Sequence, residues 1–125
     1  MKKFPSYRQT EAKDCGPTCI KIIAKYYGKL INTQELRDLS ETTREGSSLL
    51  GLSDAVESVG FKSLGVQLSF SKFLEAPLPC IVHWTGNHYV VVYKIKKNNV
   101  FISDPAHGLI TLTKEQFIKG WIGNN

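Results

Sequence analysis

The hydrophobic period of this 125-residue chain changes part-way along its length, and that change limits the folds that it can adopt. Residues 15–26 carry apolar side chains at the spacing of a helix that is buried on one side: Cys15, Cys19, Ile22, Ile23 and Tyr26. After residue 60 the sequence reads as strands separated by short polar turns. Helices followed by strands predict an α+β fold, in which N-terminal helices pack on a C-terminal antiparallel sheet.

The first helix has recognisable signals at both of its ends. Asp14 is a suitable N-cap, because a short carboxylate can accept hydrogen bonds from the free N–H groups of the first turn. Pro17 is tolerated in that turn, where its missing N–H has no partner in any case. Gly28 follows the last apolar residue and can end the helix. We therefore expect Cys15 to lie at a helix N-terminus.

Other helices are expected on both sides of the strand region. A second helix should begin near residues 32–33 with Leu36 and Leu39 facing inward, and a third should run over 48–59 until Gly60. The SKFL sequence at 71–74 predicts a short helical turn. A final helix fits the TKEQFIKGW sequence at 113–121, where Thr113 and Gln116 have the spacing of a capping box.

Five strands are expected in the second half of the chain. The first follows the alternation in FKSLGVQL, and the APLP sequence marks entry into the next strand. A TGN turn, a KKNN turn and the DPAHG sequence then separate four runs that should pair as antiparallel neighbours. The predicted strands cover residues 61–68, 80–84, 88–95, 100–103 and 109–112.

The length and composition fit one globular domain over residues 1–125. The chain has a mass of 14.0 kDa and is 42% hydrophobic and 22% charged, which suits a single packed core. No apolar segment follows Lys2 and Lys3, so the N-terminus does not resemble a secretory signal. The longest apolar runs, such as 90–93, are far shorter than the ~20 residues that span a bilayer.

The net charge of +5 raises the question of an anionic partner. The lysines are scattered along the chain and no motif that reads RNA or DNA accompanies them, so we expect a solvated basic face and no nucleic-acid partner. Attraction to an anionic membrane surface is the alternative reading. The three cysteines leave one unpaired in any disulfide scheme, and with no export signal this favours the reducing cytosol.

Cys15 is the candidate nucleophile. A cysteine attacks as the thiolate, and a free thiol with a pKa of about 8.5 is only slightly ionised at neutral pH. A helix N-terminus stabilises a nearby anion by roughly 0.3–1 kcal/mol, which changes the ionised fraction only modestly. An imidazolium partner is therefore needed as well.

Three histidines could supply that partner: His83, His88 and His107. His88 opens a strand directly after a turn, so its side chain can lie at the end of the sheet while Val90 and Val92 continue the same face into the core. His83 lies within a strand and fits a packed or surface histidine, and His107 follows Asp-Pro in an exposed loop. We interpret His88 as the base.

Two further side chains complete a candidate site for acyl transfer. Asp104 ends the strand next to that of His88, so it should lie beside the imidazole and orient it, although Asp104-Pro105 is also ordinary turn chemistry. The backbone N–H of Cys15 can stabilise the oxyanion. Gln9 can supply a second donor if residues 11–14 loop back, although a glutamine in an N-terminal segment is more often a surface residue.

Metal and redox sites are the competing interpretations of the same residues. Structural zinc sites usually show pairs of short cysteine spacings, whereas this chain has only a C-x3-C sequence and the Cys80/His83 pair. Redox chemistry of the thioredoxin type favours C-x-x-C, and the spacing here turns Cys19 to the buried helix face. We expect no metal or cofactor, with Cys19 and Cys80 in the core.

The same stretches resemble a known family. Gln9, DCGPTC at 14–19, NHYVVVYKI at 87–95 and DPAHG at 104–108 are similar to the papain-like cysteine peptidase domain at the N-terminus of bacteriocin and peptide ABC transporters. The resemblance covers nearly the whole chain, including FIKGWIG near its end, and it implies a papain-like fold. It implies that Cys15 is the nucleophile, His88 the general base and acid, Asp104 the orienting carboxylate and Gln9 the oxyanion donor.

The resemblance also implies a substrate and partners. The substrate would be a precursor peptide whose leader ends in a double glycine or a Gly-Ala pair, bound in an apolar groove that accepts an amphipathic helix. The partners would be the transmembrane and nucleotide-binding domains of a dimeric ABC transporter, at the cytoplasmic face of the cell membrane. On this reading the chain is an excised N-terminal domain, soluble in the cytoplasm by itself. A docking domain that binds leader or cargo peptides without cutting them is the alternative, although such relatives are expected to lack the nucleophile.

Overall fold

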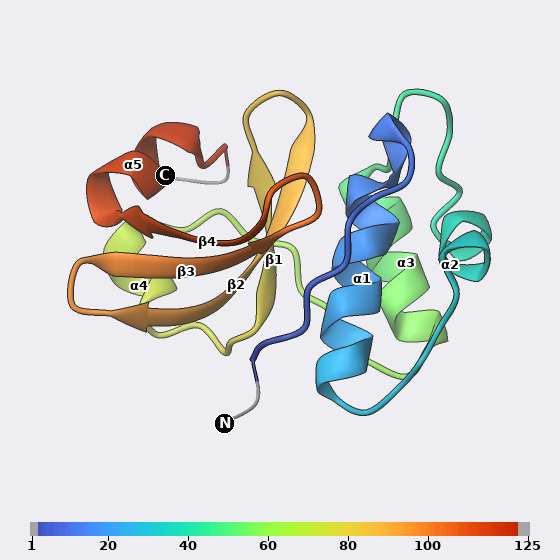
Figure 1. Cartoon of the computed structure of the whole chain (residues 1–125), viewed down its shortest axis with the longest axis horizontal. Coiled ribbons are helices and arrows are strands. Elements are labelled where there is room, and N and C mark those ends of the chain that lie inside the picture. Colours follow the sequence, from blue (N-terminus) through green and yellow to red (C-terminus); the bar gives the residue numbers. More distant parts are fainter. Residues whose placement is uncertain (1–2, 123–125) are drawn as a thin grey trace.

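The computed structural model describes residues 3–122, in which helices pack on an antiparallel sheet (Figure 1). Helices α1–α3 form one half of the molecule, and the sheet with α4 and α5 forms the other. The helices are η1 (Ala12–Asp14), α1 (Cys15–Tyr26), α2 (Thr33–Leu39), α3 (Leu49–Ser58), α4 (Phe70–Phe73) and α5 (Lys114–Gly120). The strands are β1 (Cys80–Trp84), β2 (His88–Lys96), β3 (Asn99–Asp104) and β4 (Gly108–Thr113), in the order β1-β2-β3-β4. The predicted α+β class is confirmed.

Helix α1 begins and ends as the sequence predicts, with one exception. Pro17 lies in its first turn, and Gly28 follows the helix with a φ of 86°, a conformation that glycine adopts without strain. The predicted N-cap role of Asp14 is wrong, because its side chain makes no capping hydrogen bond. Its carboxylate is fully buried and binds the Arg37 guanidinium instead, and a charged bidentate partner is stronger than a neutral N–H.

The remaining helices carry the expected caps. Asn32 caps α2, Ser48 caps α3 and Ser69 caps α4, in each case through a side-chain oxygen that accepts a backbone N–H. At α5, Thr113 and Gln116 form the predicted capping box. Within residues 3–122, no helix combines the length and the apolar character that crossing a bilayer requires.

The predicted strand over residues 61–68 is wrong. Residues 61–67 form neither strand nor helix and run outside the sheet. Leu64 is 84% exposed and Val66 is 53% exposed, so these two apolar residues do not enter a core, whereas Leu68 at the end of the segment packs against the core on the side of α4 and α5. Alternation alone predicts a strand only where a neighbouring strand offers backbone partners, and none pairs with this segment.

The hairpins form where the turn sequences predict them. Gly86 and Asn87 adopt positive φ values of 77° and 56°, which bring β2 back along β1. Strand β2 then pairs with β3, and Val91 lies opposite Ser103. This register brings the end of β3 next to the start of β2.

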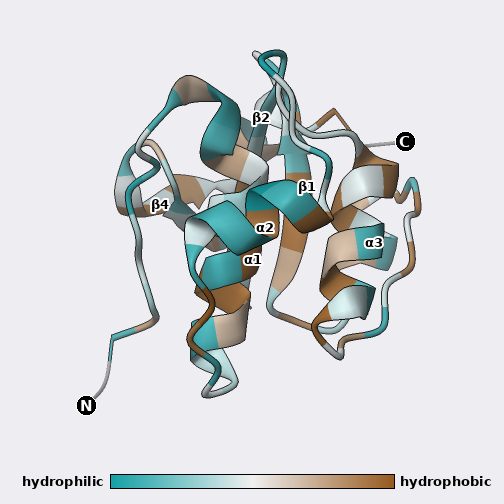
Figure 2. Ribbon diagram, turned by 90° about the vertical axis from the view of Figure 1, so that its right-hand side faces the viewer, coloured by the Kyte–Doolittle hydropathy of each residue, from teal (hydrophilic) through white to brown (hydrophobic). Residues whose placement is uncertain are grey.

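Two hydrophobic cores lie on opposite sides of the sheet, and β2 contributes to both. Tyr89 and Val91 face the helices α1–α3, whereas Val90 and Val92 face the aromatic residues that α4 and α5 supply. The ribbon of α1 alternates between hydrophilic and hydrophobic residues in Figure 2, as expected for a helix with one buried face. The sheet therefore separates the two cores.

Candidate active site

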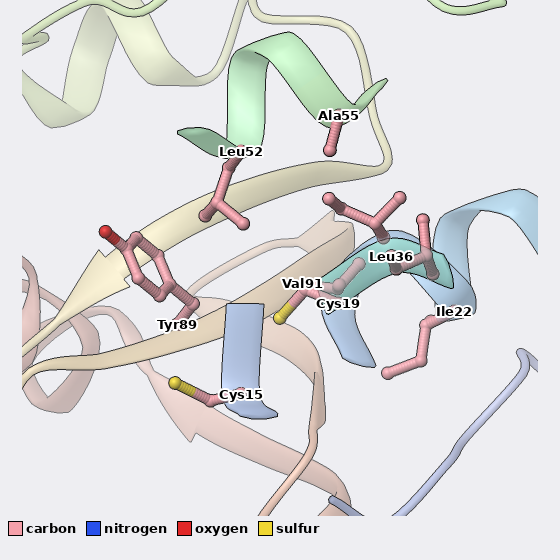
Figure 3. Close-up of a cluster of buried hydrophobic side chains, with 9 residues drawn as sticks. Cys15, Cys19, Ile22, Leu36, Leu52, Ala55, Tyr89 and Val91 are labelled. Carbon is pink, nitrogen blue, oxygen red and sulfur yellow. The ribbon is translucent and has the colours of Figure 1, made fainter. Parts of the chain in front are cut away.

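Cys15 is the first residue of α1 (Figure 3). It belongs to the core between the sheet and α1–α3, called the helix-side core below, and the core that contains Val90 and Val92 is called the sheet-side core. Cys15 is only 3% exposed, and its Sγ–H donates to the backbone carbonyl of Asn87 at 3.8 Å. Asn87 ends the β1–β2 turn directly before His88, so the N-terminus of α1 rests against the start of β2. The packing of α1 on the sheet thus brings the thiol to the histidine that the sequence singled out.

His88 joins the two halves of the site. Its Nε2 lies 2.6 Å from Oδ1 of Asp104, which leaves Nδ1 as the ring nitrogen available to the Cys15 thiol. The hydrogen bond to Asp104 and, after it, the hydrogen bond to Cys15 raise the pKa of His88 to about 9, against the opposing effect of burial. The imidazole is therefore protonated at neutral pH, as a thiolate partner requires.

Asp104 is held as a carboxylate by three donors. Besides His88, it accepts the backbone N–H of Ala106 at 2.8 Å and lies 3.0 Å from Nδ1 of His107. Burial alone would raise the pKa of Asp104, but these hydrogen bonds outweigh burial and lower it to about 2. The expected proximity of Asp104 to His88 is confirmed, and its role in orienting the imidazole stays a prediction.

Gln9 lies in the same region, but its side chain is turned into its own loop. Its backbone N–H donates to the carbonyl of Pro105 at 2.9 Å. Its Nε2 donates to the carbonyls of Glu11 and Ala12 at 3.1 and 3.3 Å, whereas its Oε1 is buried without a partner among residues 3–122. The backbone is thus anchored beside Asp104, and the carboxamide must rotate before its N–H can reach an oxyanion. The predicted role of Gln9 stays a prediction.

Sequence reasoning missed two residues that hold this region together. Arg8 donates from Nη1 and Nη2 to the carbonyls of Ala106 and His107, at 2.8 and 3.3 Å. The His107 side chain is 71% exposed, as the loop position predicts, but it also contacts Asp104. The spacing Asp-x-x-His in a turn could have indicated that contact, whereas nothing local to Arg8 indicates its partners.

The other cysteines and His83 fit packing roles. Cys19 is fully buried within the helix-side core, as predicted, and burial raises the pKa of its thiol well above the usual value (Figure 3). Cys80 is half-buried against the sheet-side core, and burial raises its pKa to about 12. His83 stacks on Tyr89 with ring centroids 4.8 Å apart. Among residues 3–122, no three or more His, Cys, Asp or Glu side chains gather where they could hold a metal ion.

This arrangement suits acyl transfer through a cysteine. The thiol is next to an imidazole, the imidazole is held by a carboxylate, and the carboxylate is held by further donors. The N-terminus of α1 adds a favourable field for the thiolate and for an adjacent oxyanion.

Comparison with known proteins identifies the family. A model of the peptidase C39 family matches residues 3–125. The chain belongs to the peptidase C39 family. Members of this family are cysteine peptidases.

The relatives of this C39 domain are parts of transport proteins. The Lactococcin-G-processing and transport ATP-binding protein LagD of Lactococcus lactis subsp. lactis is 42% identical over 129 residues, which are 98% of this chain and 18% of that protein. The Colicin V secretion/processing ATP-binding protein CvaB of Escherichia coli is 29% identical over 123 residues, again 98% of this chain and 18% of that protein. The chain thus spans about a fifth of the length of these relatives.

Solved structures confirm the papain-like peptidase fold. The peptidase domain of Streptococcus ComA, described as a bi-functional ABC transporter in a quorum-sensing pathway, superposes with a TM-score of 0.91 at 29% identity, over 97% of this chain and 94% of that chain. A double glycine motif protease from an AMS/PCAT transporter, in complex with its leader peptide, also gives 0.91, at 30% identity over 97% and 87%.

Proposed function

We propose that this C39 domain removes the leader from a precursor peptide by cutting after a double-glycine or Gly-Ala pair. The observation that carries the proposal is the position of His88, whose Nε2 binds Asp104 and whose neighbour Asn87 accepts a hydrogen bond from the Cys15 thiol, so the imidazole lies between the carboxylate and the start of α1. The relatives support the choice of substrate, because one is a lactococcin-G-processing and transport protein and another is a double glycine motif protease bound to a leader peptide.

The proposed mechanism uses Cys15 as nucleophile and His88 as acid and then base. The thiolate attacks the carbonyl carbon of the scissile bond, and a C–S bond forms as the carbonyl oxygen becomes negative. His88 gives its proton to the leaving amine as the C–N bond breaks, which leaves a thioester on Cys15. His88 then takes a proton from water, which attacks the thioester, and the leader carboxylate and the thiolate are released.

Asp104 and Gln9 support this reaction at two different atoms. Asp104 holds Nε2 of His88 and so directs Nδ1 to the sulfur. The backbone N–H of Cys15 donates to the oxyanion, and the Gln9 amide joins it after it leaves the Glu11 and Ala12 carbonyls. The oxyanion forms when the thiolate attacks the bound substrate, and its negative charge attracts the N–H groups of the Gln9 amide.

The start of α3 supports a binding surface for the leader next to the nucleophile. A Cβ added at Gly16 would lie 2.8 Å from Leu52 Cδ2, so α3 packs directly against the first turn of α1. Leu49 and Leu50 at the start of α3 are 57% and 72% exposed. These side chains are available to the apolar face of an amphipathic leader helix.

The proposed setting is a larger transporter. In it, residues 1–125 form one peptidase domain attached to transmembrane and nucleotide-binding domains, in a dimer, at the cytoplasmic face of the membrane. The ABC-transporter relatives support this setting, and they match this chain over one segment of their length.

The test compares two cysteines of the same helix. The protein is incubated with precursor peptides that carry double-glycine leaders, and the products are mapped by mass spectrometry. We expect a cut after the two small residues, its loss in Cys15→Ala with leader binding retained, and activity in Cys19→Ala. Cleavage by Cys15→Ala would contradict the mechanism, and leader binding without cleavage by the unmodified protein would favour the docking alternative.

A further inference from the structure

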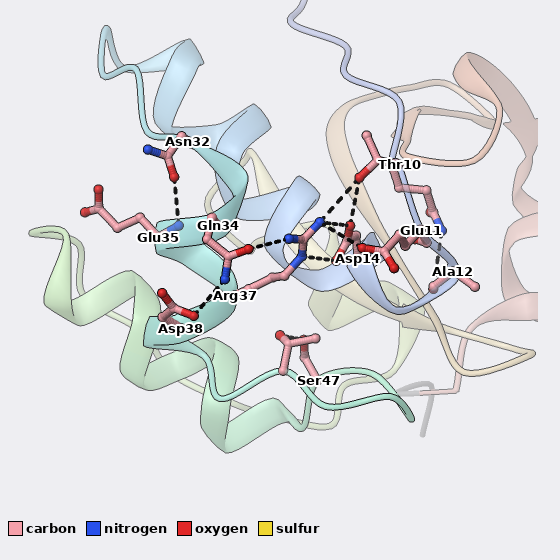
Figure 4. Close-up of polar contacts among 12 residues, drawn as sticks. Thr10, Glu11, Ala12, Asp14, Asn32, Gln34, Glu35, Arg37, Asp38 and Ser47 are labelled. Atoms are coloured by element: carbon pink, nitrogen blue, oxygen red, sulfur yellow. Dashed lines mark hydrogen bonds and ion pairs between the residues drawn. The ribbon is translucent and has the colours of Figure 1, made fainter.

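Asp14, the residue directly before Cys15, is fully buried and charged. Both of its carboxylate oxygens bind the Arg37 guanidinium of α2: Nε lies 2.7 Å from Oδ1, and Nη2 lies 2.7 Å from Oδ2 (Figure 4). Arg37, above all by these hydrogen bonds, keeps the pKa of Asp14 below its ordinary value. A bidentate pair of this kind fixes the distance and the angle between the two groups.

The same guanidinium also reaches the segment that carries Gln9. Nη2 of Arg37 lies 3.4 Å from Thr10 Oγ1 and 3.3 Å from Glu11 Oε2 (Figure 4). Thr10 Oγ1–H in turn donates to Asp14 Oδ2 at 3.0 Å. One side chain of α2 therefore holds both the residue after Gln9 and the residue before Cys15.

Arg37 is itself held in place on α2. Its Nη1 donates to Gln34 Oε1 at 2.7 Å, and Gln34 Nε2 donates to Asp38 Oδ1 at 2.9 Å. The Arg37 side chain is only 18% exposed. The guanidinium is thus fixed from its own helix before it meets Asp14.

The segment around Gln9 is held from two sides. On the sheet side, the Arg8 side chain and the Gln9 backbone bind the carbonyls of residues 105–107. On the helix side, Thr10 binds the Asp14–Arg37 pair. Gln9 lies between these two attachments, and Cys15 follows the second one.

A buried ion pair is weak support for a role in stability, because the desolvation of two charges offsets most of their attraction. In several proteins such a pair instead selects one geometry over others. The ion pair between Asp14 and Arg37 lies one residue from the proposed nucleophile, where geometry decides the rate.

We propose that Arg37, acting through Asp14 and Thr10, is a positioning residue that sets Cys15 and Gln9 relative to each other for cleavage. The proposal rests on the function proposed above. Arg37 touches no reacting atom, so its loss should slow the chemical step and leave leader binding unchanged. A misplacement of about 1 Å at a reacting group can cost about 10²-fold in rate.

The experiment measures kcat and KM of Arg37→Gln, Arg37→Lys and Asp14→Asn with a double-glycine precursor. Glu35→Ala is the matched control, because it changes an exposed residue of the same helix whose side chain takes no part in the described network of Arg37, Gln34 and Asp38. Leader affinity is measured separately in the Cys15→Ala background. Circular dichroism and titration of Cys15 with an alkylating reagent give the folded, competent fraction by which kcat is normalised.

We expect Arg37→Gln and Asp14→Asn to lower the normalised kcat by about 10–100-fold, with KM and leader affinity within about twofold of the unmodified protein. Arg37→Lys should recover part of the rate, because lysine keeps the charge but not the bidentate geometry. Glu35→Ala should retain the rate of the unmodified protein.

Two results would overturn the proposal: a normalised kcat of Arg37→Gln within twofold of the unmodified protein, or a loss that lies in leader affinity. If Arg37→Gln does not fold, Arg37→Lys decides the matter, and an unchanged kcat in that variant would overturn the proposal. Failure of the proposed function itself is recognised separately, because the unmodified protein would then not cut the precursor or Cys15→Ala would still cut it.

Discussion

The helical half and the sheet half of this domain hold their parts of the site in different ways. In the sheet half, strand register brings His88 and Asp104 together, and one hydrogen bond of 2.6 Å completes their contact. In the helical half, Cys15 and the segment of Gln9 are held by an arginine 22 residues beyond Cys15 in the sequence (37 minus 15). Strand pairing therefore brings the partners together in the sheet half, whereas in the helical half the ion pair itself joins separate elements.

Their cores differ in the same way. The sheet-side core is built on aromatic packing. The ring centroids of Phe117 and Phe73 are 5.6 Å apart in a stacked pair, and those of Phe117 and Trp121 are 5.2 Å apart. The helix-side half buries the polar residues Asp14 and Ser40 beside its aliphatic core. The helix-side core should therefore depend on specific polar partners, whereas the sheet-side core depends on the packing of aromatic rings.

Replacement of His88 by alanine should have the largest effect on activity. It removes both the acid and the base of the proposed mechanism, so kcat/KM should fall by at least about 10³-fold while the fold is retained. The measurement is the initial rate of precursor cleavage, with circular dichroism to confirm folding. His83→Ala is the control in β1, and equal losses in the two variants would contradict the assignment of the base.

Asp104→Asn should weaken the contact by which Asp104 orients the imidazole of His88. The expected loss in kcat is roughly 10²–10⁴-fold, because an amide holds the imidazole less well than a carboxylate. Asp104 is the largest of the contributions that raise the pKa of His88 to about 9, so activity should fall as pH rises through about 9, and in the variant this fall should begin at lower pH. The measurement is kcat as a function of pH from 5 to 10. If the fall in rate at high pH occurs at the same pH in both proteins, the proposed effect of Asp104 on His88 is contradicted.

Alanine substitutions in the two cores should separate an effect on the stability of the fold from an effect on the positions of the catalytic groups. Phe117→Ala should lower the free energy of unfolding by about 3–5 kcal/mol, and Leu36→Ala by about 2–5 kcal/mol, because both side chains are fully buried. Only Leu36→Ala should also lower the kcat of the folded protein, since Leu36 adjoins Arg37 on α2. Urea unfolding and rates in the folded range test this; reduced rates in both variants would show that the two halves are not independent.

His107→Ala should have the smallest effect, because this side chain is 71% exposed. Its bond helps to lower the pKa of Asp104 to about 2. That lowering stabilises the fold above the ordinary pKa of 3.8, and the stability is lost as pH falls through about 2. The variant should lose less than about 1 kcal/mol at neutral pH and unfold in acid at slightly higher pH. Acid titration by circular dichroism measures this, and a large loss of activity would give His107 a greater role.

The sheet half is the part that the sequence predicts best. Turn residues at 85–87 and 97–98 predict two hairpins, and the hairpins bring the end of β3 towards the start of β2. The capping box of Thr113 and Gln116 is equally local. Each of these features depends on residues close together in the chain, which is why pattern reasoning finds them. The register shift between Val92 and Lys94, which also sets the pairing at the end of β3, has no signal in the turn sequences.

The failures involve partners that lie far away or do not exist. Asp14 looks like an N-cap because local spacing does not reveal Arg37 on another helix. Residues 61–68 alternate like a strand, but no strand pairs with residues 61–67, and Leu64 points to solvent. The orientation of the Gln9 amide also depends on its loop, since the carbonyls of Glu11 and Ala12 take its N–H groups.

The double role of β2 has a consequence for insertions and deletions. Its residues alternate between the two cores, with Tyr89 and Val91 on one side and Val90 and Val92 on the other. Loss or gain of one residue inside this strand would exchange the two sets of side chains and turn His88 from its partners. Homologous domains should therefore vary in length at the turns on either side of β2, and its interior should be the segment where evolution accepts a change of length least readily.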